Sequence, residues 1–421
     1  MQPNCLNPSA ADSHFRYPIA TPASSLYISH VKLAHLADPH LGIRQYHRQT
    51  PAGINQREAD IAHAFRAAID GVIAARPDAV LVAGDLFHSV RPTNAAIVFA
   101  FRQFQRLREA LPDAPIVLIA GNHDTPRSVE TGTILRLFEE LNVDVAADEA
   151  RRFVYPRLDL SVLAVPHQAL VGDRPALRPE GPERNRVMVL HGEVEGVFPA
   201  DRTAAEYGGA LVGLRDLAPD AWSYIALGHY HVQHQVAPRA WYCGALEYVS
   251  PNLWGELSDE RDHGLRGKGW LLVDLGDGAA TRQPVPPARP IIDLDPVRAE
   301  GRSAAAVDAL IAERLRSIPG GIADRIVRLR VYDIPRHVGR ELNHAAVRGF
   351  KSEALHFHLD LRRPEVNRTV GVGAPGRRQT LPELVGSYLA RRPLPAELSR
   401  DDFVRLGREL MDSVERDLAG A

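Results

Sequence analysis

Apolar runs alternate with amphipathic segments over the first third of the chain. The run 31–37 (VKLAHLA) has the length and composition of a buried strand, and in the segment 57–75 large apolar residues recur every four positions, which predicts one face of a helix. The alternation continues with the strand-like runs 78–83 (DAVLVA) and 114–120 (APIVLIA) and with predicted helices over 94–110 and 132–141. Strands and helices that alternate in this way predict a parallel sheet covered by helices.

The middle of the chain changes to short strand-like runs separated by turns that contain Pro and Gly. These runs are FVYP, LSVLAVP, RVMVLHG, SYIALGH, AWYCG and GWLLVDL. They predict a second, more mixed sheet that packs against the first. The predicted fold class is therefore α/β, built around two sheets.

Composition marks the boundaries of the other parts of the chain. In chain order we predict a disordered extension (1–30), a main domain (31–275), a linker (276–290), a compact α/β unit (291–363), a basic linker (364–379) and C-terminal helices (380–421). This organisation alone does not indicate a function.

The overall composition excludes several classes of protein. Of 421 residues, 45% are hydrophobic and 24% are charged, which is ordinary for a globular protein and unlike a disordered or collagenous chain. No stretch reaches the roughly 20 apolar residues of a membrane-spanning helix, and the first thirty residues do not resemble a signal peptide. The two cysteines, Cys5 and Cys243, do not suggest a disulfide framework and suit a reducing cytoplasm.

The basic residues are almost all arginine. Of 50 basic residues three are lysine (Lys32, Lys268 and Lys351), which leaves 47 arginines, and the formal net charge is −2. Arginine binds phosphate in a bidentate manner, so this bias suits a phosphate-binding protein. Mutational bias in a GC-rich genome explains it equally simply and is the interpretation we favour, and the net charge does not indicate nucleic-acid binding.

Five short motifs follow strand-like runs, at the strand ends where α/β proteins usually carry their chemistry. They are Asp38-Pro39-His40, Gly84-Asp85-Leu86-Phe87-His88, Gly121-Asn122-His123-Asp124, His191-Gly192 and Gly228-His229-Tyr230-His231. A lone histidine at a strand end is more often structural than a ligand, and each motif is weak alone. All five together, each after a strand-like run, are very unlikely to arise by chance.

These residue types share the chemistry of metal binding. The predicted ligands are Asp38, His40, Asp85, Asn122, His191, His229 and His231. Seven ligands with one shared carboxylate, which Asp85 supplies, fit two cations roughly 3.5–4 Å apart that hydrolyse a phosphoester. Imidazole and oxygen ligands without thiolate suit Mn, Fe or Zn. His123 is then free to act as a general acid, and Asp124 either orients that imidazole or caps the following turn.

The order of these motifs resembles the calcineurin-like metallophosphoesterase family. The longer segments HLADPHLG (35–42), VLVAGDLFHSVRPT (80–93) and IAGNHDTPRS (119–128) are similar to its DNA-repair branch, the SbcD-type nuclease subunits. The resemblance continues through YCGALEYVSPNLWGE (242–256) and KGWLLVDL (268–275) and fades toward the C-terminus.

The resemblance implies a role for each motif residue. Asp38, His40, Asp85 and His231 would hold the first metal, and Asp85, Asn122, His191 and His229 the second. His123 would be the catalytic histidine near the leaving group. His88 stands where phosphoprotein phosphatases carry another sequence, which favours the nuclease branch, and we include His88 and Asp124 with His123 as candidate catalytic residues.

The resemblance also implies a fold, partners and an activity. The fold would be a four-layer α/β/β/α sandwich with a small capping domain that contacts DNA, and homodimers would form through the helices near 57–75 and 94–110. We expect a DNA exonuclease and single-strand endonuclease that uses two divalent ions, with Mn²⁺ first and Mg²⁺, Fe²⁺ or Zn²⁺ as alternatives. An SbcC-type ATPase would be its partner, and the C-terminal helices would either dock on that ATPase or pack back on the capping domain.

Two other functions remain open. One is a small-molecule phosphodiesterase or phosphatase of the same superfamily, for which the long C-terminal addition would be surplus. The other is a DNA-end tethering subunit without cutting activity, which would not need Asn122 and His123 together. The basic linker around Arg377 and Arg378 is either a solvated hinge or a contact to the phosphate backbone.

Overall fold

A computed structural model describes residues 30–126, 132–171, 174–197, 210–364, 381–392, 394 and 399–419. The chain divides into two compact units, one up to Arg362 and one from Arg363 onward. The predicted extension 1–30 and the predicted basic linker 364–379 lie outside the described residues, apart from positions 30 and 364.

The first sheet contains the parallel strands that the apolar runs predicted. Its order is β14 (Ala280–Pro284), β13 (Gly269–Asp274), β1 (Lys32–Leu36), β2 (Ala79–Val82), β3 (Ile116–Ile119) and β4 (Asp144–Ala146). Strands β1 to β4 are parallel, whereas β13 and β14 are antiparallel to their neighbours. The sequences AVLV of β2 and IVLI of β3 are buried throughout, as expected for strands covered on both faces.

Strand β14 corrects one expectation, because it lies inside the segment 276–290 that composition marked as a linker. Its residues pair with β13 from Gly269 opposite Pro284 to Val273 opposite Ala280. Backbone hydrogen bonds to a neighbouring strand hold this segment despite its many Gly and Pro residues.

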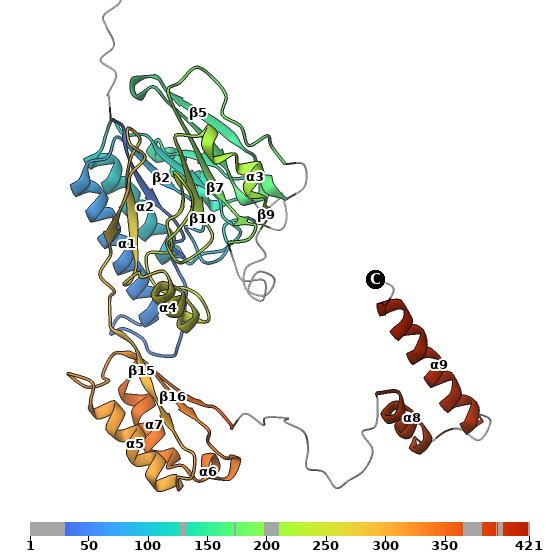
Figure 1. Cartoon of the computed structure of the whole chain (residues 1–421). Helices are drawn as coiled ribbons and strands as arrows, with labels where there is room; N and C mark the ends of the chain where they lie inside the picture. The colour runs from blue at the N-terminus through green and yellow to red at the C-terminus, as the bar shows by residue number, and fades with distance from the viewer. Residues whose placement is uncertain are drawn as a thin grey trace, which may run out of the picture. The chain divides into compact units, whose positions relative to one another are not determined.

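Helices α1 (Gln56–Ala75) and α2 (Asn94–Ala110) pack on this sheet, at the positions that the four-residue spacing predicted (Figure 1). The side chain of Asn55 caps α1 by accepting from two backbone N–H groups, and Thr93 caps α2. The predicted helix over 132–141 forms instead as the 3₁₀ helix η2 (Ile134–Leu141), whose Phe138 packs against Phe104 of α2.

The second sheet is mixed, as predicted. Its order is β11 (His234–Ala237), β12 (Ala240–Tyr242), β10 (Tyr224–Gly228), β7 (Asn185–His191), β6 (Leu160–Val165) and β5 (Arg151–Tyr155). Among its further elements are α3 (Leu214–Leu217), η3 (Pro156–Leu158), η4 (His167–Leu170), η5 (Pro219–Ala221) and the two-stranded sheet β8 (Glu193–Val194) and β9 (Leu211–Val212). Residues of α3, η4, β8 and β9 join a core with this sheet that is separate from the main one. The outer layer of the second sheet is therefore built from short elements in the described part of the chain.

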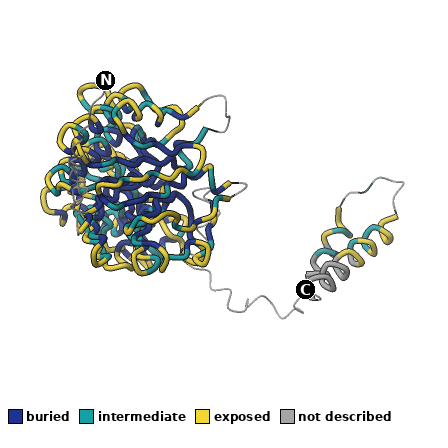
Figure 2. The backbone as a smooth tube through the Cα atoms, turned by 90° about the horizontal axis from the view of Figure 1, so that it is seen from above, coloured by how far each residue is buried: buried dark blue, intermediate teal, exposed yellow. Residues whose placement is uncertain are grey.

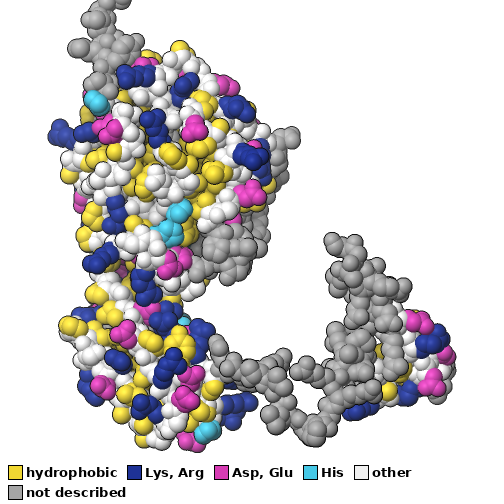
Figure 3. Space-filling view, viewed as in Figure 1, with side chains coloured by type: hydrophobic (Ala, Val, Ile, Leu, Met, Phe, Trp, Pro, Cys, Tyr) yellow, Lys and Arg dark blue, Asp and Glu magenta, His cyan; other side chains and the backbone are white. Residues whose placement is uncertain are grey.

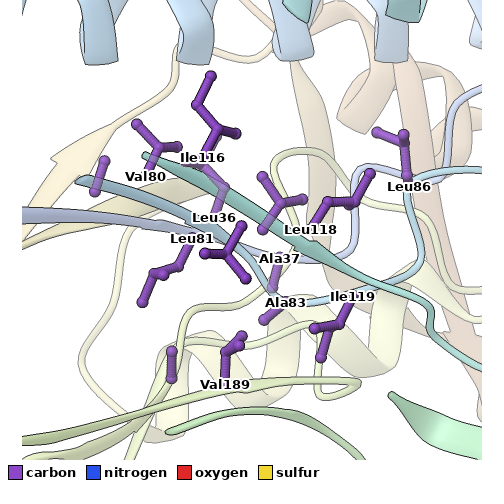
Figure 4. Close-up of a cluster of buried hydrophobic side chains, with 14 of the residues drawn as sticks. Leu36, Ala37, Val80, Leu81, Ala83, Leu86, Ile116, Leu118, Ile119 and Val189 are labelled. Atoms are coloured by element: carbon purple, nitrogen blue, oxygen red, sulfur yellow. The ribbon is translucent and has the colours of Figure 1, made fainter. Parts of the chain in front are cut away.

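The main core lies between and around the two sheets. In Figure 4, Ala83 and Ile119 of the first sheet lie on the side that faces Val189 of the second, whereas Val80 and Leu118 point to the other side, toward the helices. All five are at most 1% exposed, and Figure 2 shows the buried backbone concentrated in the centre. These layers confirm the predicted sandwich of two sheets between helical layers.

A third, smaller sheet has a core of its own. Its parallel strands β15 (Ile291–Arg298), β16 (Ile326–Tyr332) and β17 (His356–Leu361) are accompanied by α5 (Ala304–Arg316), α6 (Arg336–Glu341) and α7 (His344–Glu353). Val307, Ile311 and Leu329 are at most 1% exposed within its separate hydrophobic cluster. These elements occupy the range 291–363, where the sequence predicted a compact α/β unit.

Ion pairs and an apolar cluster connect this small sheet to the larger part. Arg289 pairs with Asp60 of α1 at 2.6 Å, and Arg48 pairs with Asp324 at 2.8 Å. Trp254 of helix α4 (Leu253–Asp262) forms an apolar cluster with Ile326 and Leu355 of the small unit, and its ring lies under the guanidinium of Arg328 at 4.8 Å.

In the second unit the described residues form the helices α8 (Leu381–Arg391) and α9 (Arg400–Ala419), in the predicted C-terminal helical region. No helix in the described part of the chain combines the length and hydropathy needed to span a bilayer. On the face drawn in Figure 3, basic and acidic side chains are interspersed, in keeping with a net charge near zero.

Candidate metal centre

The five motifs begin at or just after the carboxyl ends of β1, β2, β3, β7 and β10, so both sheets contribute to one site. Backbone hydrogen bonds join the first two motif loops, from the Asp38 N–H to the Gly84 carbonyl (3.1 Å) and from the His40 N–H to the Asp85 carbonyl (2.9 Å). The Asp38 carboxylate also accepts from the His229 N–H at 3.0 and 3.1 Å, which connects the first sheet to the second. Hydrogen bonds from backbone N–H groups thus join the motif loops to each other.

Four of the seven predicted ligands have a left-handed backbone. The φ angles are 50° at Asp38, 47° at His40, 50° at Asp85 and 110° at His229. Residues other than glycine rarely adopt positive φ, and each such residue costs on the order of 1–3 kcal/mol. The surrounding fold stabilises these strained backbone conformations, which occur where the motif side chains meet.

Two glycines of the motifs allow the sheets to approach closely at the site. A Cβ on Gly228 would lie 1.8 Å from the Ala83 carbonyl oxygen, so no side chain fits there. Gly84 has a φ of +89°, and a Cβ there would lie 2.3 Å from Nδ1 of His191. These glycines are required by contact between β2 and the second sheet.

The Asp85 carboxylate lies between two imidazoles that come from different sheets. Its Oδ2 is 3.5 Å from Nε2 of His40 and 3.4 Å from Nε2 of His191. All three side chains are at most 2% exposed. One oxygen flanked by two ring nitrogens is the arrangement expected of a carboxylate shared by two cations.

The other predicted ligands form a group on each side of Asp85. On one side, the ligand atoms of Asp38, His40 and His231 lie within 4.8 Å of one another, and the two Nε2 atoms of the histidines are 3.2 Å apart. On the other side, Oδ1 of Asn122 is 3.0 Å from Nε2 of His191 and 3.2 Å from Nδ1 of His229. The structure therefore brings all seven predicted residues together.

Hydrogen bonding and burial prepare these histidines for metal binding. Nδ1 of His191 donates to the Ala83 carbonyl at 2.8 Å, so Nε2 is the nitrogen that faces the site and would bind a cation once it loses its proton. Burial lowers the pKa of His40 and of His229 well below the usual value, so both rings are neutral, the form that ligates metals.

Asp85 is ionised at neutral pH. Burial acts to raise its pKa, but His191, followed by His40, lowers it well below its usual range. Burial acts to lower the pKa of His191, but Asp85 raises it to about 9. Asp85 and His191 therefore share the proton on Nε2 of His191, which faces Oδ2 of Asp85, and a bound cation would take the place of that proton.

His123 and His88 lie together beside Asp85. The backbone N–H of His123 donates to Oδ1 of Asp85 at 2.8 Å, and its Nδ1 donates to the His88 carbonyl at 2.8 Å. The two rings stack with centroids 5.1 Å apart, and Nδ1 of His88 is 3.3 Å from Nδ1 of His40. Burial, followed by the charge of His123, lowers the pKa of His88 to about 4.

The contacts of Asp124 favour the second of its two predicted roles, which is to hold a turn. Its carboxylate is 2% exposed and accepts from three backbone N–H groups, those of Leu86 (3.0 Å), Phe87 (2.9 Å) and Gly121 (3.2 Å). The His123 ring is bonded instead to the His88 carbonyl. Asp124 therefore joins the loop of Asp85 to the loop of Asn122 and does not orient the imidazole.

A family model for calcineurin-like phosphoesterases matches residues 31–254. This chain belongs to that family. The match confirms the resemblance that the motifs suggested and covers all five of them.

Several curated relatives of this phosphoesterase bear the name DNA double-strand break repair protein Mre11. The protein of Sulfurisphaera tokodaii is 29% identical over 268 residues, which are 61% of this chain and 63% of that protein. The protein of Saccharolobus solfataricus is 29% identical over 255 residues (58% and 60%), and that of Aeropyrum pernix 31% identical over 281 residues (62% of each). The matched region spans about three fifths of the length of these relatives.

The donor set of this phosphoesterase fits divalent cations. It offers imidazole nitrogens, two carboxylates and one amide oxygen. Cys243, the one cysteine in the described part of the chain, does not add a thiolate to this set, because its thiol points to the His35 carbonyl. Such a set suits Mn, Fe or Zn and does not resemble a thiolate structural zinc site.

Three residues near the site were not identified from the sequence. The ring of His167 lies 6.5 Å from that of His191, and it follows β6 at a strand end, the same signal that found the other motifs. Glu256 and Lys268 lie behind His231. Lys268 carried a signal as well, since it is one of only three lysines in the chain.

Proposed function

We propose that this chain is a metal-dependent DNA phosphodiesterase that acts on DNA breaks or hairpins, as an exonuclease and single-strand endonuclease of the SbcD type. The observation that carries the proposal is the Asp85 carboxylate between His40 and His191, with His123 beside it. The relatives named as DNA double-strand break repair proteins support DNA as the substrate.

The seven clustered residues would hold two cations, with Asp85 shared. The first would be held by Asp38, His40, Asp85 and His231, and the second by Asp85, Asn122, His191 and His229. Bound divalent ions, of which we propose Mn²⁺ first and Mg²⁺, Fe²⁺ or Zn²⁺ as alternatives, would activate water and clamp phosphoryl oxygens.

His123 would act as the general acid. In hydrolysis the attacking water loses one proton and its oxygen forms a bond to phosphorus, while the bond from phosphorus to the 3′ oxygen breaks and that oxygen takes up one proton and leaves as an alcohol. Because the His88 carbonyl engages Nδ1 of His123, its Nε2 is the nitrogen that can deliver this proton. His88 would hold the His123 ring by stacking, and Asp124 would support the loops.

The proposed assembly is a homodimer that works with an SbcC-type ATPase. Between α1 and α2 lies a cavity of about 340 Å³ lined in part by Ile54, Ala62 and Phe99, and Val98 of α2 is 47% exposed. These apolar groups support a dimer face on the two helices. The helices α8 and α9 are the segments we propose for contact with the ATPase.

The test is cleavage of labelled DNA by purified full-length protein with Mn²⁺, Mg²⁺ or a chelator. A blunt duplex and a hairpin are compared with the small ester bis-p-nitrophenyl phosphate. We expect Mn²⁺-dependent cutting of both DNAs that the chelator abolishes. Turnover of the small ester while both DNAs stay intact, with and without an SbcC-type ATPase, would favour a small-molecule enzyme instead.

A further inference from the structure

A buried cluster of charged residues lies behind His231 and outside the five motifs. It consists of Glu256 and Glu260 on α4 and Lys268 just before β13, all at most 6% exposed. Buried charges are costly unless they are paired, so their arrangement calls for an explanation. Each is paired, and two of them contact His231 directly.

Glu256 contacts the ring of His231 on the side away from His40. Its Oε1 is 3.4 Å from Nδ1 of His231 and accepts the Ser250 N–H at 2.7 Å. The other nitrogen of that ring, Nε2, lies 3.2 Å from Nε2 of His40 in the first metal group. A carboxylate facing Nδ1 keeps the proton there and leaves the Nε2 lone pair for a cation.

Lys268 holds both Glu256 and the backbone of His231. Its Nζ is 2.7 Å from Oε2 of Glu256 and 3.0 Å from Oε1 of Glu260, and it donates to the His231 carbonyl at 2.9 Å. The ammonium group thus forms ion pairs with two carboxylates and donates one hydrogen bond, to the backbone of His231. The Tyr248 ring lies 4.6 Å from Nζ.

The lysine itself is informative in a chain with 47 arginines and three lysines. Three acceptors converge on one nitrogen at Lys268, which suits a compact ammonium and does not suit the planar fork of a guanidinium. The chemistry of this position therefore overrides the arginine bias of the chain.

We propose that Glu256, held by Lys268, is the positioning residue that fixes the tautomer and orientation of His231 for the first cation. This inference rests on the proposed metal centre. Glu260 provides a matched control, because it shares Lys268 but its carboxylate is bonded to the Tyr248 hydroxyl (2.7 Å). Residues that orient metal ligands in this way typically contribute about 10–100-fold to metal affinity.

The experiment is calorimetric titration of Mn²⁺ into the metal-free full chain, for the wild type and the variants Glu256→Gln and Glu260→Gln. We expect two ions in the wild type, one of which binds Glu256→Gln about 10–100-fold more weakly while the other is little changed. Glu260→Gln should bind both ions within about threefold of the wild type, although it also deprives Lys268 of a partner. Thermal unfolding of both variants is the control that checks that they are folded.

A further variant at position 256 keeps the proposal testable if Glu256→Gln does not fold. Glu256→Asp keeps the charge that pairs with Lys268 but shortens the reach toward His231 by one methylene, and it should weaken the same ion. Unchanged binding in both Glu256 variants, or equal weakening in Glu260→Gln, would overturn the positioning role alone. Failure of the wild type to bind two ions would overturn the proposed metal centre, and the positioning role with it.

Discussion

Asp124 provides a graded test of how the site is held together. Its two oxygens accept three buried backbone N–H groups, two on Oδ2 from Leu86 and Gly121 and one on Oδ1 from Phe87. Asp124→Ala leaves all three donors without a partner. Asp124→Asn keeps one oxygen for two of the donors but turns an amide NH₂ toward the third.

The magnitudes follow from the number of lost bonds. A buried N–H group left without a partner costs about 1–3 kcal/mol, so Asp124→Ala, which leaves three, should lower the free energy of unfolding by roughly 3–9 kcal/mol. Asp124→Asn leaves one of the three N–H groups without a partner, so a loss of about 1–3 kcal/mol is expected. Because the loops of Asp85 and Asn122 lose their connection, Mn²⁺ affinity should fall in the same order.

Urea denaturation of the metal-free protein, followed by tryptophan fluorescence, measures the stability of the three proteins, and calorimetry measures their Mn²⁺ affinity. A loss of less than about 1 kcal/mol in Asp124→Ala would refute the account of three essential acceptor contacts. So would equal losses in the two variants. If Asp124→Asn were stable and bound metal normally but cut no DNA, Asp124 would be catalytic after all.

Four further outcomes are expected. His123→Ala should abolish DNA cleavage but keep both metal ions, because its ring is not among the proposed ligands; activity and metal content are measured together. Burial lowers the pKa of His35 from 6.5 to about 3, so the folded protein holds the ring neutral. This contribution to stability is complete above pH 6.5 and is lost as the pH falls. Between pH 7 and pH 5 the free energy of unfolding should therefore drop by about 2 kcal/mol more in the wild type than in His35→Gln. Gly228→Ala should cost at least about 3 kcal/mol in urea denaturation, since its Cβ would meet the Ala83 carbonyl at 1.8 Å. Val98→Asp should halve the molar mass in light scattering if the α2 face forms the dimer.

Each of these outcomes has a control or a contradicting result. Loss of metal from His123→Ala would reassign that residue as a ligand, and equal pH dependence in His35→Gln would show that His35 is not the titrating group. Gly349→Ala is the control for Gly228, because a Cβ there meets nothing within 4 Å. A wild-type monomer, or a Val98→Asp dimer, would exclude the proposed dimer face.

Local patterns predicted the main sheet and the seven clustered residues. Runs such as AVLV and IVLI have the apolar character of strands buried on both faces, and polar residues directly after parallel strands must meet at one edge of the sheet. For this reason Asp38, Asp85 and Asn122 could be placed together from the sequence. The second sheet contributed His191 and His229 by the same rule.

Tertiary contacts that no local pattern encodes explain what was missed. Glu256 and Lys268 meet at His231 only because α4 and the start of β13 fold behind it, 25 and 37 residues further along the chain. Strand β14 has the composition of a linker and forms because β13 offers an open edge. The left-handed φ of His40 and His229 is likewise imposed by the surrounding fold, since the sequence places no glycine there.

The most direct test of the account is the number of Mn²⁺ ions bound per chain, measured by equilibrium dialysis and elemental analysis in the wild type and in Asp85→Asn. The Asp85 carboxylate lies between His40 and His191, so we predict two ions in the wild type and a loss of affinity for both in the variant, together with the loss of DNA cleavage. A wild type that binds a single ion, or an Asp85→Asn protein that keeps both ions and cuts DNA normally, would contradict the shared-carboxylate centre on which the proposed function rests.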